Sequence, residues 1–350
     1  MSKPTTFGPG PSALYPFVGE VMNEAFVSGI LEASHRSNAF VNLYFETKEL
    51  LHDRLNLPGD YFVYFLNSAT EAWNVVAEGY VLRKSLHYFS GDFGRKWFEY
   101  THKIHCESVG IPFQADETPH VDTDTETELI ALTHNETSNG SRVDCGSISE
   151  IKRNNSHALV AADATSSMAG VALDFGAADI WFASVQKCFG LPAGLGVMFA
   201  SPRAVEKMNN VAFDKRYNAV INIHRAALKG QTVCTPNVLG IYLLNGVLKR
   251  IENVSSIENR MIERSNKAYQ IPNSRFRTLV NNPKTRSNTV MCFRCGNPDE
   301  LKHIFLERHN IQLGSGYGEW KSSTFRIANF PAVSDEVFYN LIHLLSDYQP

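Results

Sequence analysis

The stretch that decides the fold is Asp179-Ile-Trp-Phe-Ala-Ser-Val-Gln-Lys187-Cys-Phe-Gly-Leu-Pro-Ala-Gly194. Its apolar first half predicts a buried strand, and Lys187 stands just past the end of that strand. Upstream, Ala158-Leu-Val-Ala-Ala162 predicts a second buried strand, which is followed by Asp163. Ligands bind outside the carboxyl ends of strands in an open parallel sheet, so both side chains are expected at one ligand-binding edge.

The same alternation of strands and helices extends through the first two thirds of the chain. Besides the two strands above, strands are expected at 61–66, 86–90, 129–133 and 194–200, and helices at 16–31, 41–55, 68–82 and 95–106. Strands that alternate with helices indicate an α/β fold with a mostly parallel sheet. Ser68-Ala-Thr-Glu71 has the pattern of a capping box, which marks the start of the third helix.

The last third of the chain is more polar and has a different pattern. A long helix is expected at 236–251, and it is followed by a strand at 289–293, a helix at 299–309, a strand at 325–328 and a helix at 335–348. These elements predict a small α+β domain over 246–350, onto which residues 1–14 pack. Residues 15–245 then form the large domain.

Composition limits the kinds of partner. The 350 residues are 43% hydrophobic and 20% charged, with a formal net charge of -3, so no basic excess points to nucleic acid. No apolar run is long enough for a membrane span and the first residues lack a signal-peptide core, so a cytoplasmic protein is expected. Cys292 and Cys295 form a lone C-x-x-C without a second ligand pair, so no metal site is expected.

Lys187 and Asp163 together suit one cofactor. Pyridoxal phosphate needs a lysine amine for its Schiff base and an acidic partner for its ring nitrogen. Each residue also has an ordinary interpretation, as a surface lysine after a strand or as an aspartate that caps a helix. The pairing of the two, with a glycine-rich loop after Lys187, favours the cofactor.

Other residues are candidates for the remaining groups of such a site. Ala69 and Thr70 begin a helix after a strand, where free N–H groups attract a phosphate. Phe93 follows the next strand and offers an aromatic face on which a flat ring could stack. Arg36 and Arg326 are candidates for substrate anions, because a guanidinium binds carboxylate or phosphate through two parallel hydrogen bonds.

Several motifs resemble those of one enzyme family. The chain is similar over nearly its whole length to the class V, fold type I aminotransferases, and among them to the phosphoserine aminotransferases. The motifs that carry this resemblance are Phe7-Gly-Pro-Gly-Pro-Ser-Ala-Leu-Tyr-Pro16, Ser34-His35-Arg36, His134-Asn-Glu-Thr137-Ser-Asn-Gly140, Ala183-Ser-Val-Gln186-Lys187, Thr235-Pro236 and Phe325-Arg326.

The resemblance implies a role for each matched residue. Lys187 would form the Schiff base, and Asp163 would pair with the ring nitrogen. Phe93 stands where the family has a stacking tryptophan. The other implied cofactor contacts are Thr137, Gln186, Ala69, Thr70 and, on the phosphate of the neighbouring subunit of a homodimer, Thr235. His35 and Arg36 would meet the phosphate end of the substrate and Arg326 its α-carboxylate, in amino transfer between glutamate and 3-phosphohydroxypyruvate.

The chain departs from the family in places that bear on the substrate. A His-Arg pair that the family has before its Met-Arg strand is missing from 313–319, and Lys321 is one candidate for a replacement cation. An alanine–glyoxylate type of transaminase, whose substrate carries no phosphate, is therefore the alternative. A cysteine desulfurase would need histidines at positions 93 and 186, and a nicotinamide-dependent dehydrogenase would need a glycine fingerprint that the loop at Ser68 lacks.

Overall fold

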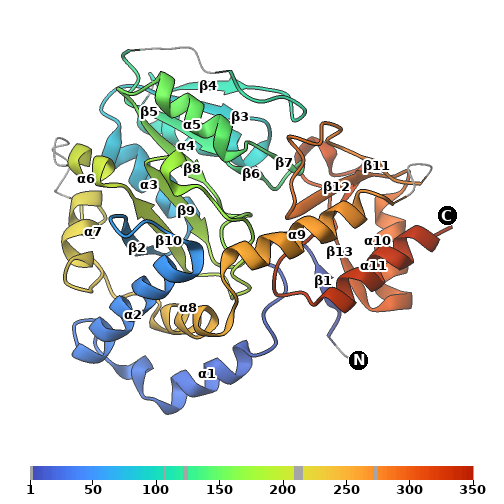
Figure 1. Cartoon of the computed structure of the whole chain (residues 1–350), viewed down its shortest axis with the longest axis horizontal. Coiled ribbons are helices and arrows are strands. Elements are labelled where there is room, and N and C mark those ends of the chain that lie inside the picture. Colours follow the sequence, from blue (N-terminus) through green and yellow to red (C-terminus); the bar gives the residue numbers. More distant parts are fainter. Residues whose placement is uncertain (1–2, 106, 121–124, 209–215, 272–274, 350) are drawn as a thin grey trace.

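The structure is a computed structural model, and it describes residues 3–105, 107–120, 125–208, 216–271 and 275–349. A seven-stranded sheet and a five-stranded sheet lie side by side, each with helices packed on it (Figure 1). The seven-stranded sheet lies within the expected range 15–245, and the five-stranded sheet combines residues 5–7 with residues 277–328. The division of the chain into two domains at residue 245 stays a prediction.

The large sheet is mostly parallel, as predicted from the alternation of elements. Its strands, in spatial order, are β2 (Phe62–Leu66), β10 (Gly196–Ala200), β9 (Ile180–Ser184), β8 (Leu159–Asp163), β5 (Leu129–Thr133), β3 (Ser85–Phe89) and β4 (Val109–Pro112). Only β10 is reversed, because it is antiparallel to both β2 and β9. The reversal follows from the short connection between β9 and β10, since a parallel strand would require a long crossover. Lys187 lies in this connection.

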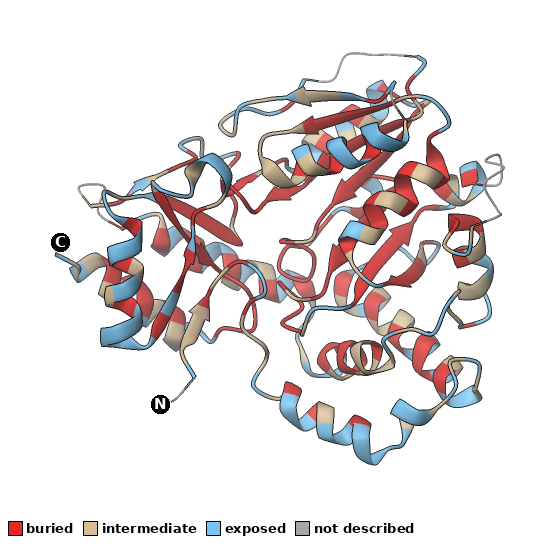
Figure 2. Ribbon diagram, turned by 180° about the vertical axis from the view of Figure 1, so that it is seen from behind, coloured by how far each residue is buried: buried red, intermediate tan, exposed pale blue. Residues whose placement is uncertain are grey.

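Both faces of the large sheet are covered by helices. Alternate residues of β9 enter different cores: Ile180 and Phe182 pack with α3 (Ala69–Tyr80), α4 (Asp92–Ile104), α6 (Pro202–Met208) and α7 (Val220–Ala227), whereas Trp181 and Ala183 pack with α2 (Asn38–Leu55), α5 (Cys145–Asn154) and α8 (Val238–Arg250). Figure 2 shows the resulting layer of buried strands between half-buried helices. This burial on both faces explains why the central strands β5, β8, β9 and β10 are nearly continuous apolar runs rather than alternating.

The second sheet is mixed and small. Its order is β1 (Thr5–Phe7), β13 (Ile311–Ser315), β14 (Thr324–Ala328), β12 (Val290–Arg294) and β11 (Arg277–Thr278), with β1 parallel to β13 and the other pairs antiparallel. Its core is rich in phenylalanine and is closed by α9 (Val254–Ala268), α10 (Pro298–His309) and α11 (Asp335–Asp347). Cys292 lies buried in β12, as the strand interpretation of this segment predicted.

The remaining elements are short. They are α1 (Val18–Val27), the 3-10 turns η1 (Ile30–Glu32), η2 (Phe175–Ala177) and η3 (Gly318–Trp320), and the hairpin of β6 (Asn135–Glu136) and β7 (Ser141–Arg142). No helix among the described residues is long and apolar enough to cross a membrane. Within the same residues, no group of three or more His, Cys, Asp or Glu side chains could hold a metal ion.

Candidate active site

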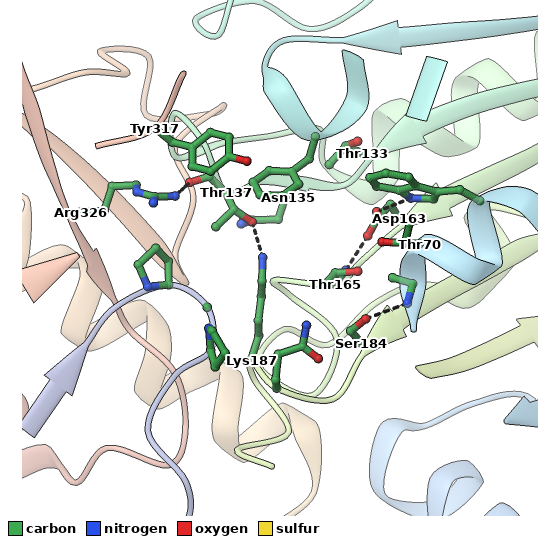
Figure 3. Close-up of a pocket in the computed structure, with 17 residues that line it drawn as sticks. Thr70, Thr133, Asn135, Thr137, Asp163, Thr165, Ser184, Lys187, Tyr317 and Arg326 are labelled. Atoms are coloured by element: carbon green, nitrogen blue, oxygen red, sulfur yellow. Dashed lines mark hydrogen bonds between the residues drawn. The ribbon is translucent and has the colours of Figure 1, made fainter. Parts of the chain in front are cut away.

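One cavity lies where three neighbouring strands of the large sheet end. Thr133 ends β5, Asp163 ends β8 and Ser184 ends β9, and all three line this cavity (Figure 3). The other lining residues are Pro9, Gly10, Pro11, Ala69, Thr70, Trp73, Phe93, Asn135, Thr137, Thr165, Gln186, Lys187, Tyr317 and Arg326. The carboxyl-end rule for parallel sheets therefore holds here. Arg326 on β14 and Tyr317, in the connection between β13 and β14, complete the cavity.

Lys187 points into this cavity from the β9–β10 connection. Its side chain is buried, and its Nζ atom donates a 2.7 Å hydrogen bond to Thr137 Oγ1. Burial lowers the pKa of Lys187 to about 8, although the carboxylates of Asp163 and Glu136 oppose this shift. A lysine with such a pKa is available in its neutral, nucleophilic form near neutral pH.

Asp163 faces the same cavity from the end of β8. Its carboxylate accepts hydrogen bonds from Trp73 Nε1 and from the backbone N–H of Thr165, both at 2.9 Å. Burial raises the pKa of Asp163, and the hydrogen bonds from Thr165 and Trp73 oppose this shift. A buried carboxylate in this setting is stabilised by a cationic partner, which a protonated ring nitrogen would supply.

The start of α3 forms one end of the cavity. The Ser68 hydroxyl accepts a hydrogen bond from the Glu71 backbone N–H at 3.1 Å, as the capping box predicts. The Glu71 carboxylate, however, accepts from the backbone N–H of Asn67 at 2.6 Å rather than from that of Ser68. The Ala69 N–H donates to Ser184 Oγ at 2.7 Å, which places this helix terminus against the end of β9.

Phe93 is held in place by a buried glutamate. Glu136 Oε2 accepts hydrogen bonds from the backbone N–H groups of Phe93 and Gly94, each at 3.1 Å, at the start of α4. The other oxygen, Oε1, accepts from the backbone N–H and the hydroxyl of Ser138, at 2.9 and 2.7 Å. The Phe93 ring lies 5.1 Å from Lys187 Nζ, measured to the ring centroid.

Arg326 comes from the small sheet. Its Nη1 atom donates to the Thr137 carbonyl oxygen at 2.8 Å, and its Nε atom donates to the Ser315 carbonyl oxygen at 2.6 Å. Thr137 therefore accepts from Lys187 through its hydroxyl and from Arg326 through its carbonyl. In Figure 3, Arg326 and Tyr317 lie on one side of Lys187, whereas Asp163, Thr70 and Ser184 lie on the other.

Eight of the residues predicted from sequence line this cavity, and three do not. The eight are Lys187, Asp163, Ala69, Thr70, Phe93, Thr137, Gln186 and Arg326. Arg36 is exposed and His35 half-buried in the turn between η1 and α2, and Thr235 is exposed before α8. Within one chain, these three lie outside the cavity lining.

Sequence reasoning missed several residues that shape the site. Trp73 lies one helical turn after Ala69, so the spacing placed it on the same face of α3. Glu136 is part of the quoted Asn-Glu-Thr motif but had no role assigned. Gly10 has a φ of 153°, and a Cβ atom there would lie 3.1 Å from Lys187 Cε, so the close approach of this segment requires glycine.

Comparison with known proteins places this site in a family. The model of the class-V aminotransferase family matches residues 111–321, which include Thr137, Asp163 and Lys187. The chain belongs to the class-V aminotransferases. Among curated members, the phosphoserine aminotransferase of Rhodococcus opacus (strain B4) is 26% identical over 345 residues, which cover 94% of this chain and 91% of the relative.

Solved structures of class-V aminotransferases share the fold. The phosphoserine aminotransferase from Cytophaga hutchinsonii superposes with a TM-score of 0.95 at 33% identity, and all of both chains is covered. The alanine–glyoxylate aminotransferase from Nostoc sp. gives a TM-score of 0.83 at 21% identity, covering 99% of this chain and 95% of the other. The α/β prediction with a mostly parallel sheet is thereby confirmed as the fold of type I pyridoxal-phosphate transferases.

Proposed function

We propose that this class-V aminotransferase uses pyridoxal phosphate to move an amino group between glutamate and 3-phosphohydroxypyruvate, giving 2-oxoglutarate and phosphoserine. The observation that carries the proposal is the placement of a buried lysine and a buried carboxylate on the walls of one cavity, Lys187 and Asp163, with Arg326 on the opposite side. The substrate class is supported by the likeness to the Cytophaga hutchinsonii phosphoserine aminotransferase over the full length of both chains.

The residues present fit pyridoxal phosphate. The Lys187 amine, with a pKa lowered to about 8, would hold the aldehyde carbon, and the buried Asp163 carboxylate would hold the ring nitrogen. The N-terminus of α3 at Ala69 and Thr70, with the Ser184 hydroxyl and Gln186, would hold the phosphate. When bound, the cofactor supplies an aldehyde that combines with amines and a ring that withdraws electrons from the substrate carbon.

The protein's own groups bind the substrate and move the proton. Arg326 orients the α-carboxylate through its guanidinium fork. Once its amine is free, Lys187 can take the proton from the α-carbon and return it elsewhere, because its pKa near 8 suits both directions of transfer. Thr137 Oγ1 holds that amine at 2.7 Å between transfers, and Phe93 shields it on one side.

The experiment begins with purified protein supplied with pyridoxal phosphate. A visible absorption band is expected, and borohydride should attach the cofactor covalently to Lys187, as peptide mapping would reveal. Labelling of another lysine would refute the site. O-phosphoserine with 2-oxoglutarate should be turned over far faster than alanine with glyoxylate. The reverse preference would favour the alternative transaminase without a phosphate substrate.

We further propose a homodimer in which Arg36, His35 and Thr235 act on the cavity of the neighbouring subunit. The support is that these residues lie outside the cavity lining of their own chain. Close to Arg36 in sequence, Phe26 and Val27 on α1 are each 75% exposed, so two adjacent apolar side chains face outward there. A second copy of the chain would bury them.

Subunit mixing tests this arrangement. Lys187→Ala and Arg36→Ala should each abolish or sharply reduce turnover of O-phosphoserine when assayed alone. If Arg36 acts across the interface, random mixing of the two variants should restore about a quarter of wild-type activity, because half of the dimers then carry one intact site. No recovery after mixing, with exchange verified by mass, would place Arg36 in its own subunit's site.

A further inference from the structure

The proposed substrates carry two anionic ends, and the cationic residues of this chain that line the cavity, Lys187 and Arg326, leave the second end to the neighbouring subunit's Arg36 alone. Phosphoserine has a phosphate and glutamate a side-chain carboxylate in addition to the α-carboxylate, which Arg326 would bind. The family's His-Arg pair is missing from 313–319, and Lys321, the replacement cation considered from sequence, is exposed and does not line the cavity. A cation of the same chain near the cavity would share this role with Arg36 of the neighbouring subunit.

Lys96 is such a cation. It follows Phe93 by three residues on α4, so both side chains lie on one face of the helix. Lys96 Nζ donates a 2.6 Å hydrogen bond to Tyr317 Oη, and Tyr317 lines the cavity. The Tyr317 ring in turn stacks on Phe93, with 5.1 Å between centroids and 26° between planes. Lys96 is thus attached to the cavity wall that Phe93 and Tyr317 form.

The ammonium group of Lys96 is near one acid but is not paired with it. Besides the hydrogen bond to Tyr317, the charge of Asp92 raises the pKa of Lys96, but the Asp92 carboxylate accepts a 2.5 Å hydrogen bond from Arg95 Nη2. In the described part of the chain, no carboxylate forms an ion pair with Lys96. The hydrogen bond to Tyr317 raises the pKa of Lys96, so the amine stays an ammonium group at neutral pH.

Tyr317 connects this ammonium group with the rest of the cavity. Its oxygen already accepts from Lys96, so its single O–H proton remains for another acceptor. The Arg326 guanidinium lies 5.4 Å from the Tyr317 ring centroid, which puts the two substrate-binding groups next to each other. Figure 3 shows Tyr317 and Arg326 on the same side of the cavity, away from Asp163.

We propose that Lys96 and Tyr317 together bind the distal anion of the substrate, the phosphate of phosphoserine and, in the other half-reaction, the side-chain carboxylate of glutamate. The assignment rests on the proposed function and adds the residues that select the substrate. Tyr317 donates its O–H to the anion, and Lys96 supplies the charge. The pair takes the place of the missing His-Arg pair.

Kinetics of Lys96→Met test the assignment, with Lys321→Met as the matched control. Loss of a charged hydrogen bond should raise the KM for O-phosphoserine by about 10- to 100-fold. The kcat should stay nearly unchanged, and the KM for alanine should not move. Tyr317→Phe should raise the KM for O-phosphoserine less, and it should likewise leave the KM for alanine unchanged. Lys96→Arg, which keeps the charge, should recover part of the affinity.

A second measurement uses inorganic phosphate as a competitive inhibitor of the wild-type enzyme. Its inhibition constant should rise with Lys96→Met and stay constant with Lys321→Met. The inference would be overturned if Lys96→Met raised the KM for alanine and for O-phosphoserine equally, or if Lys321→Met raised the KM for O-phosphoserine more than Lys96→Met does. Either result would leave the proposed function intact. A wild-type enzyme that transaminates glutamate but never O-phosphoserine would instead overturn the proposed function, and the phosphate assignment with it.

Discussion

The indole Nε1–H of Trp73 donates a 2.9 Å hydrogen bond to the buried carboxylate of Asp163. This contact joins the first turns of α3 to the end of β8, so one side chain fixes both the helix that would hold a phosphate and the acid that would hold the ring nitrogen. Trp73 lines the cavity and also positions Asp163, and the hydrogen bond between them carries the second role.

Trp73→Phe should weaken cofactor binding. Removing a hydrogen bond to a charged group costs about 1.5–3 kcal/mol, so the dissociation constant of pyridoxal phosphate should rise by roughly tenfold or more. Trp97→Phe is the matched control, because Trp97 stacks beside Trp73 and its Nε1 has no hydrogen-bond partner among the described residues. Equal dissociation constants for the two variants, measured by fluorescence titration, would contradict this role.

Lys187→Met should change how stability depends on pH in the cofactor-free protein. The folded pKa of Lys187, about 8, lies below the ordinary value of 10.5, so the unfolded chain binds more protons between these values. This group's contribution to stability therefore rises with pH, by about 2.5 kcal/mol between pH 7 and pH 10.

Denaturation in urea at several pH values measures this effect. At pH 7 the Met variant should be more stable relative to wild type, and the difference should shrink toward pH 10. A difference that stays constant across this range would show that Lys187 has an ordinary pKa in the folded protein. Taking the difference in the free energy of unfolding between variant and wild type at each pH cancels the contributions of the other groups that titrate over the same range.

Glu136→Gln should destabilise the fold and displace Phe93. A glutamine has one acceptor oxygen, so its NH2 group would face either the N–H groups of Phe93 and Gly94 or the N–H and hydroxyl of Ser138. We expect a loss of about 3 kcal/mol in the free energy of unfolding. The control is Glu99→Gln on α4, where Glu99 forms an exposed ion pair with Arg95. This change should lower the free energy of unfolding much less, and similar losses for both variants would refute the role assigned to Glu136.

Arg326→Lys should impair every amino acid substrate alike. The guanidinium holds two carbonyl oxygens and presents its remaining donors to the cavity, a geometry that an ammonium group cannot reproduce. The KM for alanine and for O-phosphoserine should both rise by about 10- to 100-fold. The exposed Arg294 on the adjacent strand provides the control Arg294→Lys. A KM that rises for only one of the two substrates would contradict the assignment of Arg326 to the α-carboxylate.

The sequence was sufficient for six of the seven strands of the large sheet, because their mostly apolar runs are buried on both faces. It missed the edge strand β4, a short VGIP segment that is only partly buried. It was insufficient for α9, whose buried face includes Arg264 and Ser265 and so lacks a clear apolar period. It also missed β13, where exposed Gln312 interrupts a short segment. The expected helix at 236–251 begins at Val238 instead, because Asn237 caps it through the Gly240 N–H.

The site was predictable where a reactive side chain stands at or just past the end of a strand, as Asp163 and Lys187 do. Contacts between distant segments were not predictable, because no local pattern reveals that Lys96 meets Tyr317 or that Arg326 meets Thr137. The roles of His35 and Thr235 were implied by family likeness alone, and Arg36 was a candidate from its guanidinium chemistry as well. A single chain does not bring these three residues to the cavity.

The pairing of β1 with β13 has a consequence for synthesis on the ribosome. Thr5 lies opposite Ile311, so the first strand to emerge has no partner until nearly the whole chain has been made. Residues 9–11 line the cavity beside Lys187 and lie between β1 and Ser12, whose N–H donates to the Gln186 carbonyl oxygen at 3.2 Å. Both ends of this segment are therefore fixed only when β1 has paired with β13. The large sheet can collapse early through contacts closer in sequence, whereas the catalytic pocket is sealed as one of the last events of folding.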